Sequence, residues 1–165
     1  MLQIREARHA DLERITEIRN DAILHTAATF DAEPKTASEQ EAWLSAHGER
    51  FAILVAELDR EVVGWGALSK WSDRRAWAET AVISLYVDAK HRGRGLGTEV
   101  LESLLRTAIR NGFHTVISRI AGGNAASIHL HEKFGFRHIG VMKEVGRKHG
   151  KYLDLLLMQK ILSRE

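Results

Sequence analysis

A basic, glycine-rich loop joins an apolar strand to an amphipathic helix, and this arrangement constrains the fold more than any other segment. The run reads YVDAKHRGRGLGTEVLESLL, from Tyr86 to Leu105. Glycine permits the positive φ angles that a tight turn needs. The first turn of a helix has unpaired N–H groups and a partial positive charge. The segment therefore predicts a strand, a phosphate-binding turn and a helix in succession.

The glycine spacing disfavours two common nucleotide-binding motifs. With Gly93 and Gly95 as the first two glycines of G-x-G-x-x-G, the third position holds Thr98. The Gly-Lys-Ser/Thr ending of a P-loop is absent. A tight turn with exposed arginines remains the structural alternative.

Composition indicates one globular domain over residues 1–165. A chain of 165 residues that is 44% hydrophobic can bury a core, and it contains no cysteine for thiol chemistry or disulfides. Neither a signal-like N-terminus nor a long apolar run is present, so we expect a cytoplasmic protein with no membrane span. A net charge of +2 without a basic stripe predicts no nucleic-acid partner. We expect the second basic cluster, Arg147 to Lys151, to be solvated.

Hydrophobic periodicity predicts an α+β fold with a central, mixed sheet flanked by helices. The predicted strands are Leu2–Ala7, Phe51–Leu58, Val62–Lys70, Thr80–Val87, Thr115–Ile120, Phe136–Val145 and Tyr152–Ile161. The predicted helices are Asp11–Leu24, a segment from a capping box at Thr36–Glu39 to about His47, the segment from Leu96 to Asn111-Gly112, and Asn124–Phe134. A strand, a helix and a second strand in succession predict one parallel pair.

Several segments resemble the Gcn5-related N-acetyltransferase (GNAT) superfamily. The loop RGRGLG and the segment Gly123 to Phe136 carry this similarity. Within the superfamily, Thr26 to Phe30, Phe113 to Val116 and Val145 to Gln159 resemble the phosphinothricin and methionine sulfoximine acetyltransferase group. The resemblance covers nearly the whole chain and implies the GNAT acyl-CoA N-acyltransferase fold, with a central twisted mixed sheet.

The resemblance also implies that acetyl-CoA binds with its pyrophosphate on the loop and its pantetheine along the preceding strand. The residues implied to contact the cofactor are Leu85, Tyr86, Val87, Arg92, Gly93, Arg94, Gly95, Leu96, Gly97, Thr98, Asn124 and Lys133. For Asn124 a helix N-cap is an equal alternative, and for Lys133 a plain surface lysine is the preferred interpretation.

His131 and Glu33 are the candidate catalytic residues. The resemblance places His131 where many superfamily members have the tyrosine that protonates the leaving thiolate; a packed helix histidine is the alternative. Relatives of the phosphinothricin type have a glutamate, their proposed general base, where this chain has Val82. Glu33 lies in a loop that matches a family segment near the acceptor, and a solvated carboxylate is its alternative. Glu79 would face away from the base position on a regular strand.

The resemblance places the acceptor amine near the loop after the third strand and on the fourth strand. The residues implied to bind it are Phe30, Trp71, Ser72, Asp73, Arg74, Val82, Ile83 and Ser84. The family arginine that would pair with a substrate carboxylate is Ala78 here, and Arg74 or Arg75 could replace it from a shifted position. Trp65, Trp71, Trp77 and Tyr86 could form an aromatic wall, or they could be core residues.

These observations predict an acetyl-CoA-dependent N-acetyltransferase that acts on a small primary amine, such as an amino acid or an analogue of the phosphinothricin or methionine sulfoximine type. The alternatives are a non-catalytic acyl-CoA-binding module and an acetyltransferase of protein N-termini or lysines. The resemblance implies a homodimer. No metal site is predicted, because His129 and His131 point to nearly opposite sides of a helix and no carboxylate cluster accompanies them.

Overall fold

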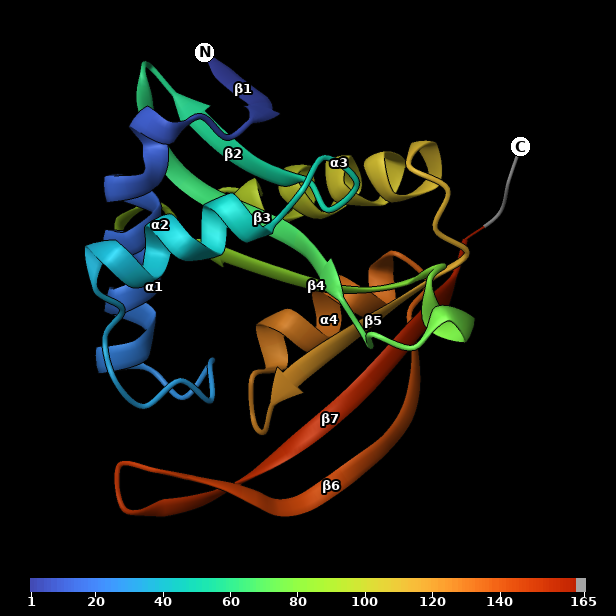
Figure 1. Cartoon of the computed structure of the whole chain (residues 1–165). Helices are drawn as coiled ribbons and strands as arrows, with labels where there is room; N and C mark the ends of the chain where they lie inside the picture. Colours follow the sequence, from blue (N-terminus) through green and yellow to red (C-terminus); the bar gives the residue numbers. More distant parts are fainter. Residues whose placement is uncertain (163–165) are drawn as a thin grey trace.

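The computed structural model describes residues 1–162, which form a strongly twisted sheet with helices on both faces (Figure 1). The strands are β1 (Leu2–Glu6), β2 (Ile53–Leu58), β3 (Glu61–Lys70), β4 (Thr80–Val87), β5 (Thr115–Ala121), β6 (Arg137–Lys148) and β7 (Lys151–Ile161). The helices are α1 (Leu12–His25), α2 (Ala37–Ala46), α3 (Leu96–Arg110) and α4 (Ala125–Lys133). Three short 3-10 helices are η1 (His9–Asp11), η2 (Arg75–Trp77) and η3 (Ala89–His91).

The strand order is β1-β2-β3-β4-β5-β7-β6, and only the β4–β5 pair is parallel within the described residues. Helix α3 makes the crossover between these two strands, so the predicted mixed sheet is confirmed. The long β6–β7 hairpin sweeps away from the rest of the sheet and leaves β6 at an edge (Figure 1).

Successive side chains of each strand point to opposite faces of the sheet and pack into two apolar clusters, one on each face. On one face, Val100 and Leu104 of α3 pack with Leu54 and Ile83. On the other face, Ile15 and Ile18 of α1 pack with Val55, and Trp65 joins the same cluster. Both clusters hold the central strands rigidly, and this fixes the position of the ends of β4 and β5.

The parallel strands β4 and β5 separate before either of them ends. Their pairing runs from Thr80 with Thr115 to Ile83 with Ser118, and no pairing joins them beyond this point. Strand β4 continues to Val87, while the end of β5 remains paired with β7. On its β5 side, the main chain of β4 after Ile83 therefore faces an opening instead of a neighbouring strand, while β3 remains paired on the other side.

The structure confirms most predicted elements and corrects some of their limits. The capping box is present, because Thr36 Oγ1 accepts from the Glu39 N–H and Glu39 accepts from the Thr36 N–H. Strands β2 and β3 form a hairpin whose turn at Asp59-Arg60 has left-handed φ angles of 50° and 72°. The strand predicted to end at Val145 continues to Lys148, because the hairpin turns only at His149-Gly150. None of the helices formed by residues 1–162 has the length and apolarity needed to cross a bilayer.

Candidate active site

The loop between β4 and α3 exposes the start of the helix to a cavity. Gly93 and Gly95 have φ angles of 74° and 79°, in the left-handed region that favours glycine. Gly95 is the N-cap of α3, and its carbonyl accepts the first helical hydrogen bond, from the Glu99 N–H at 3.2 Å. The preceding N–H groups of the first turn have no partner inside the helix. The loop therefore presents main-chain donors to an anion, as its sequence predicts.

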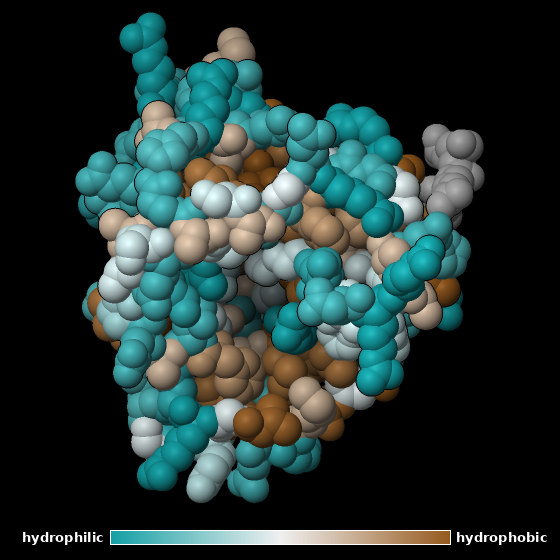
Figure 2. Space-filling model, viewed as in Figure 1, coloured by the Kyte–Doolittle hydropathy of each residue, from teal (hydrophilic) through white to brown (hydrophobic). Residues whose placement is uncertain are grey.

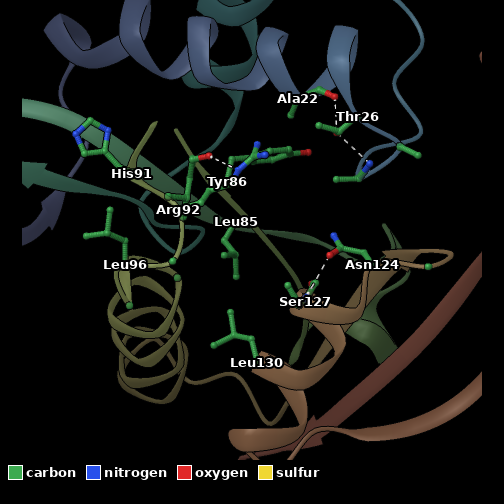
Figure 3. A pocket seen from close by; sticks show the side chains of 18 of the residues that line it. Ala22, Thr26, Leu85, Tyr86, His91, Arg92, Leu96, Asn124, Ser127 and Leu130 are labelled. Carbon is green, nitrogen blue, oxygen red and sulfur yellow. Dashed lines mark hydrogen bonds between the residues drawn. The ribbon is translucent and has the colours of Figure 1, made fainter. Parts of the chain in front are cut away.

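A cavity of about 530 Å³ lies in front of this loop, a size typical of ligand sites (Figure 3). Leu85 and Leu130 point toward one another across it, and α1 covers its far side near Ala22 and Thr26. At Gly97 an added Cβ would lie 3.3 Å from Leu130 Cδ2 and 3.7 Å from Leu85 Cδ1. A side chain at position 97 would thus narrow the passage between α3 and α4.

A second cavity of about 650 Å³ continues from the first through the opening between β4 and β5. The two cavities share Leu85, Tyr86, Asn124 and Ser127 in their walls. Figure 2 shows a hollow at the centre of this face, with hydrophobic residues gathered on its lower border. The cleft therefore has a basic, glycine-lined end and a second chamber beyond the separating strands.

His131 of α4 is buried and lines the second cavity. Its Nδ1 lies 2.7 Å from the Ser127 carbonyl oxygen, which can only accept, so Nδ1 carries the proton and donates. Its Nε2 lies 2.9 Å from Ser118 Oγ. Burial lowers the pKa of His131, and the Ser127 bond opposes this only partly. The imidazole is therefore neutral near pH 7, and its Nε2 accepts a hydrogen bond from the Ser118 hydroxyl.

The loop between α1 and α2 forms one wall of the second cavity. Its lining residues are Thr29, Phe30 and Asp31. Asp31 pairs with Arg19 at 3.1 Å and with Lys35 at 3.4 Å. Although burial alone would raise the pKa of the Asp31 carboxyl, these two cations lower it. Asp31 is thus a neutralised carboxylate, poorly suited to accept a proton.

Lys148 fixes this loop to the β6–β7 hairpin. Its Nζ donates to the Thr29 carbonyl oxygen at 2.9 Å, and only 6% of the residue is exposed. Burial lowers the pKa of the lysine, opposed by the charge of Asp31. A Cβ at Gly146 would collide with the Phe30 ring, so the ring lies directly on the hairpin. The prediction that the second basic cluster is fully solvated is therefore wrong at Lys148.

Arg119 of β5 also lines the second cavity, and its guanidinium lies over the Trp71 ring at 5.7 Å from the ring centroid. Trp71 in turn packs against Trp77, with ring centroids 6.1 Å apart. Within residues 1–162, no hydrogen bond or ion pair joins the Arg119 guanidinium to another group. The stacked ring therefore orients a cation whose hydrogen-bonding capacity is unused.

Most of the predicted cofactor residues lie together in the first cavity. The residues in its wall are Leu85, Tyr86, Val87, Arg92, Gly93, Gly95, Leu96, Gly97 and Asn124, whereas Arg94, Thr98 and Lys133 lie outside it. Asn124 caps α4, because its Oδ1 accepts from the Ser127 N–H at 3.2 Å, so it is both an N-cap and a lining residue.

The predicted acceptor and catalytic residues divide between the second cavity and its surroundings. Phe30, Val82, Ile83, Ser84 and His131 line it. Trp71, Ser72, Asp73, Arg74 and Glu33 do not, although Trp71 contacts Arg119, which does line it. Of the proposed aromatic wall, Tyr86 lines the cleft, and Trp65 is buried beneath it with ring centroids 4.8 Å apart.

Sequence reasoning missed Ser118 and Arg119. A signal for Ser118 is present, because this serine alternates with the buried Val116 and Ile120 on the inner face of a strand. A hydroxyl at such a position needs a partner. Among residues 1–162, no cluster of three or more acidic or histidine side chains could hold a metal ion.

The sequence matches a known family and several characterised proteins. Residues 12–136 match the acetyltransferase (GNAT) family. The chain is 39% identical to the L-methionine sulfoximine/L-methionine sulfone acetyltransferase of Pseudomonas paraeruginosa, over 94% of this chain and 92% of the relative. It is 36% identical to the L-amino acid N-acyltransferase MnaT of Escherichia coli, over 96% and 92% of the two chains.

A solved structure shows the same architecture. The phosphinothricin acetyltransferase of Sinorhizobium meliloti, crystallised in complex with acetyl-CoA, superposes with a TM-score of 0.95 and is 33% identical. The match covers 98% of this chain and 89% of that protein. The predicted fold is therefore confirmed at the level of strand order and overall superposition.

Proposed function

The chain belongs to the acetyltransferase (GNAT) family, and we propose that it transfers the acetyl group of acetyl-CoA to the primary amine of a small molecule, namely an amino acid or an amino-acid analogue. The observation that carries this proposal is the continuous cleft, in which a helix start with free N–H groups leads to the end of β4, which has no partner strand on its β5 side, and then to a second chamber. We further propose that residues 1–165 form one acetyltransferase domain, located in the cytoplasm.

The first cavity fits coenzyme A by its chemistry. Main-chain N–H groups of the loop and the α3 start suit a diphosphate, and the absence of a side chain at Gly97 leaves the approach to the helix open. Leu85, Tyr86 and Val87 offer main-chain groups that can pair with pantetheine amides as an added strand would. Bound there, the cofactor supplies an activated acetyl thioester. Arg94 and Thr98 belong to the loop and the first turn of α3, so they can contribute main-chain N–H groups although they lie outside the cavity wall, whereas Lys133 would contribute only through its side chain.

His131 is the proton-transfer residue of this proposal. It lies in the second cavity next to the opening between the strands, which is where the thioester would meet the amine. Its neutral, oriented imidazole can accept a proton near pH 7. Glu33 remains a second candidate, but it is not among the residues that line either cavity, and this favours His131.

An acceptor with a carboxylate is supported by Arg119. In the second cavity Arg19 is neutralised by Asp31, whereas the guanidinium of Arg119 keeps its donors free among residues 1–162. A guanidinium matches a carboxylate with two parallel hydrogen bonds. Arg119 therefore supplies the cation that Ala78 cannot supply. It does so from the neighbouring strand rather than through Arg74 or Arg75, which lie outside the cavity wall.

An assay of thiol release from acetyl-CoA tests both the proposed acetyl transfer and the proposed binding of a carboxylate by Arg119. The acceptors are L-methionine sulfone, its primary amide and its decarboxylated amine. We expect the free acid to have the highest kcat/KM. We also expect Arg119→Gln to lower kcat/KM for the acid about 10- to 100-fold, because one charged hydrogen-bonding partner is lost. The amide and the amine should respond little to this change. Arg74→Gln and Arg75→Gln serve as matched controls.

Two alternative activities have distinct results in the same assay. Coenzyme A binding without thiol release from any amine would show a non-catalytic acyl-CoA-binding module. Release only with peptides would show an acetyltransferase of proteins. The second cavity does not favour peptides, because among residues 1–162 its one lining carboxylate, Asp31, is already paired with Arg19 and Lys35 and gives no acidic groove.

We also propose that the protein is a homodimer that pairs through β6. This strand lies at the sheet edge, and its apolar side chains Ile139, Val141, Met142 and Val145 are exposed. An unpaired edge with exposed apolar side chains is suited to association with a second chain.

A further inference from the structure

Ser118 lies at the point where the central strands separate. It pairs with Ile83 as the last residue of β5 in register with β4, and the cleft opens immediately beyond it. Ser118 is one of the residues that line the second cavity, although only 2% of the residue is exposed. A hydroxyl at this position borders the space in which the amine and the thioester must meet.

The hydroxyl is oriented by His131. Because Nδ1 donates to the Ser127 carbonyl oxygen, Nε2 has a lone pair, and Ser118 Oγ donates to it at 2.9 Å. The edge of the imidazole packs on Phe136, with ring centroids 4.9 Å apart, which keeps the ring in place. The oxygen of Ser118 therefore retains its own lone pairs for a donor on the cavity side.

The cavity lacks another suitable base. Val82 cannot accept a proton, and the carboxylate of Asp31 is held by two cations. Within residues 1–162, the imidazole of His131 is thus the one neutral base in the cavity wall, and Ser118 separates its Nε2 from the open space.

We propose that Ser118 is a catalytic residue that contacts the acceptor amine and passes its proton to His131. The inference rests on the proposed acetyltransferase function. The amine nitrogen uses its lone pair to form the C–N bond, and its N–H proton moves to Ser118 Oγ as the Ser118 proton moves to His131 Nε2. The C–S bond breaks with its electron pair on sulfur. The imidazolium then returns one proton through the same hydroxyl to the thiolate, so that amide and thiol are the only products.

The test compares Ser118→Ala and Ser118→Thr with the wild type, using acetyl-CoA and L-methionine sulfone. General acid–base catalysis contributes about 10²- to 10⁴-fold. We expect Ser118→Ala to lower kcat at least about 100-fold with the coenzyme A Kd changed by less than about twofold. Ser118→Thr, which keeps the hydroxyl, should recover most of the activity. In the wild type the lower inflection of kcat/KM against pH belongs to the Ser118–His131 pair, and it should vanish in Ser118→Ala.

Several outcomes would overturn the proposal. A near wild-type kcat in Ser118→Ala would show that the hydroxyl is not required. An unchanged lower inflection of kcat/KM against pH in this variant would show that the Ser118 hydroxyl transfers no proton. Acetylated Ser118 in the intact mass after reaction with acetyl-CoA would replace proton transfer by an acyl-enzyme. If the wild type itself releases no thiol with any amine, the proposed acetyltransferase function is wrong as well. Equal turnover by the wild type and Ser118→Ala is a different result, because it contradicts only the role of Ser118.

One measurement is independent of turnover. Nitrogen chemical shifts of the His131 ring should show a protonated Nδ1 and an unprotonated Nε2 at pH 7. The opposite tautomer would remove the acceptor on which the transfer depends, even if Ser118→Ala were inactive.

Discussion

Replacing Gly97 with alanine should weaken coenzyme A binding without weakening the fold. Gly97 is the second residue of α3, and its φ is not in the left-handed region. Alanine is favoured over glycine inside a helix by about 1 kcal/mol. The new Cβ would lie 3.3 Å from Leu130 Cδ2, which requires a shift of a few tenths of an ångström at the end of a flexible side chain. The two effects are opposite in sign, so we expect the free energy of unfolding to change by less than about 1 kcal/mol.

The effect on binding should be larger. A methyl group between Leu130 and Leu85 narrows the entry to the helix start, and an anion can no longer approach the first N–H groups closely. A hydrogen bond to a charged group contributes about 1.5–3 kcal/mol, so the loss of one raises the Kd about 10- to 100-fold.

Calorimetry with free coenzyme A measures this Kd, and urea unfolding measures the stability. Gly140→Ala is the matched control, because a Cβ there meets no atom within 4 Å. A Kd for folded Gly97→Ala within about twofold of the wild type would refute the assignment of the diphosphate to the α3 start.

Three further predictions concern the loop, the buried histidines and the edge strand. Lys148→Met should raise the KM for the acceptor several-fold and leave the coenzyme A Kd unchanged, because the loop at Thr29 loses its hydrogen bond to Lys148. Lys151→Met, at an exposed position, is the control, and an unchanged KM in Lys148→Met would contradict a role of Lys148 in positioning the loop. Burial lowers the pKa of His131 and of His47, so as the pH falls the unfolded chain binds protons at a higher pH than the folded chain. The free energy of unfolding should therefore keep its highest value above pH 6.5 and decrease below it. In urea titrations from pH 7.5 to about 5.5, the dependence of the unfolding free energy on pH should be weaker in His131→Asn than in the wild type. An identical pH dependence in the two proteins would argue against a buried neutral ring. Ile139→Glu should make the proposed dimer monomeric in sedimentation, whereas a monomeric wild type would disprove pairing through β6.

The sequence predicts the geometry of the loop before α3 well because its determinants are contiguous. The glycines that adopt positive φ, the cap of α3 and the strand before it lie within one short segment, so local rules suffice. The element order likewise follows from periodicity and from one crossover, and errors are confined to the ends of elements such as β6.

The second cavity is predicted less well because its walls come from segments far apart in the chain. The loop after α1 is placed by Arg19 and Lys148, which bring Asp31 rather than Glu33 to the cavity. Ser118 and His131 meet only because α4 packs back on β5. No local pattern encodes such a contact. A polar residue at an inner strand position is the signal that indicates it.

Strand alternation on β5 separates the two residues with proposed roles in the cleft, although they are adjacent in the chain. Ser118 points to α4 and Arg119 lies over Trp71, so their side chains occupy opposite faces of the strand and share no partner. The proposed diphosphate site, by contrast, depends on the loop before α3. If one residue handles the proton and the other holds a carboxylate, the effects of Ser118→Ala and Arg119→Gln on log kcat/KM should add for an amino acid, because independent sites are additive. For the corresponding amide only the serine change should matter, and the coenzyme A Kd should be unchanged in the double variant. A double variant no worse than either single variant would instead show that the two residues act on the same step through one contact.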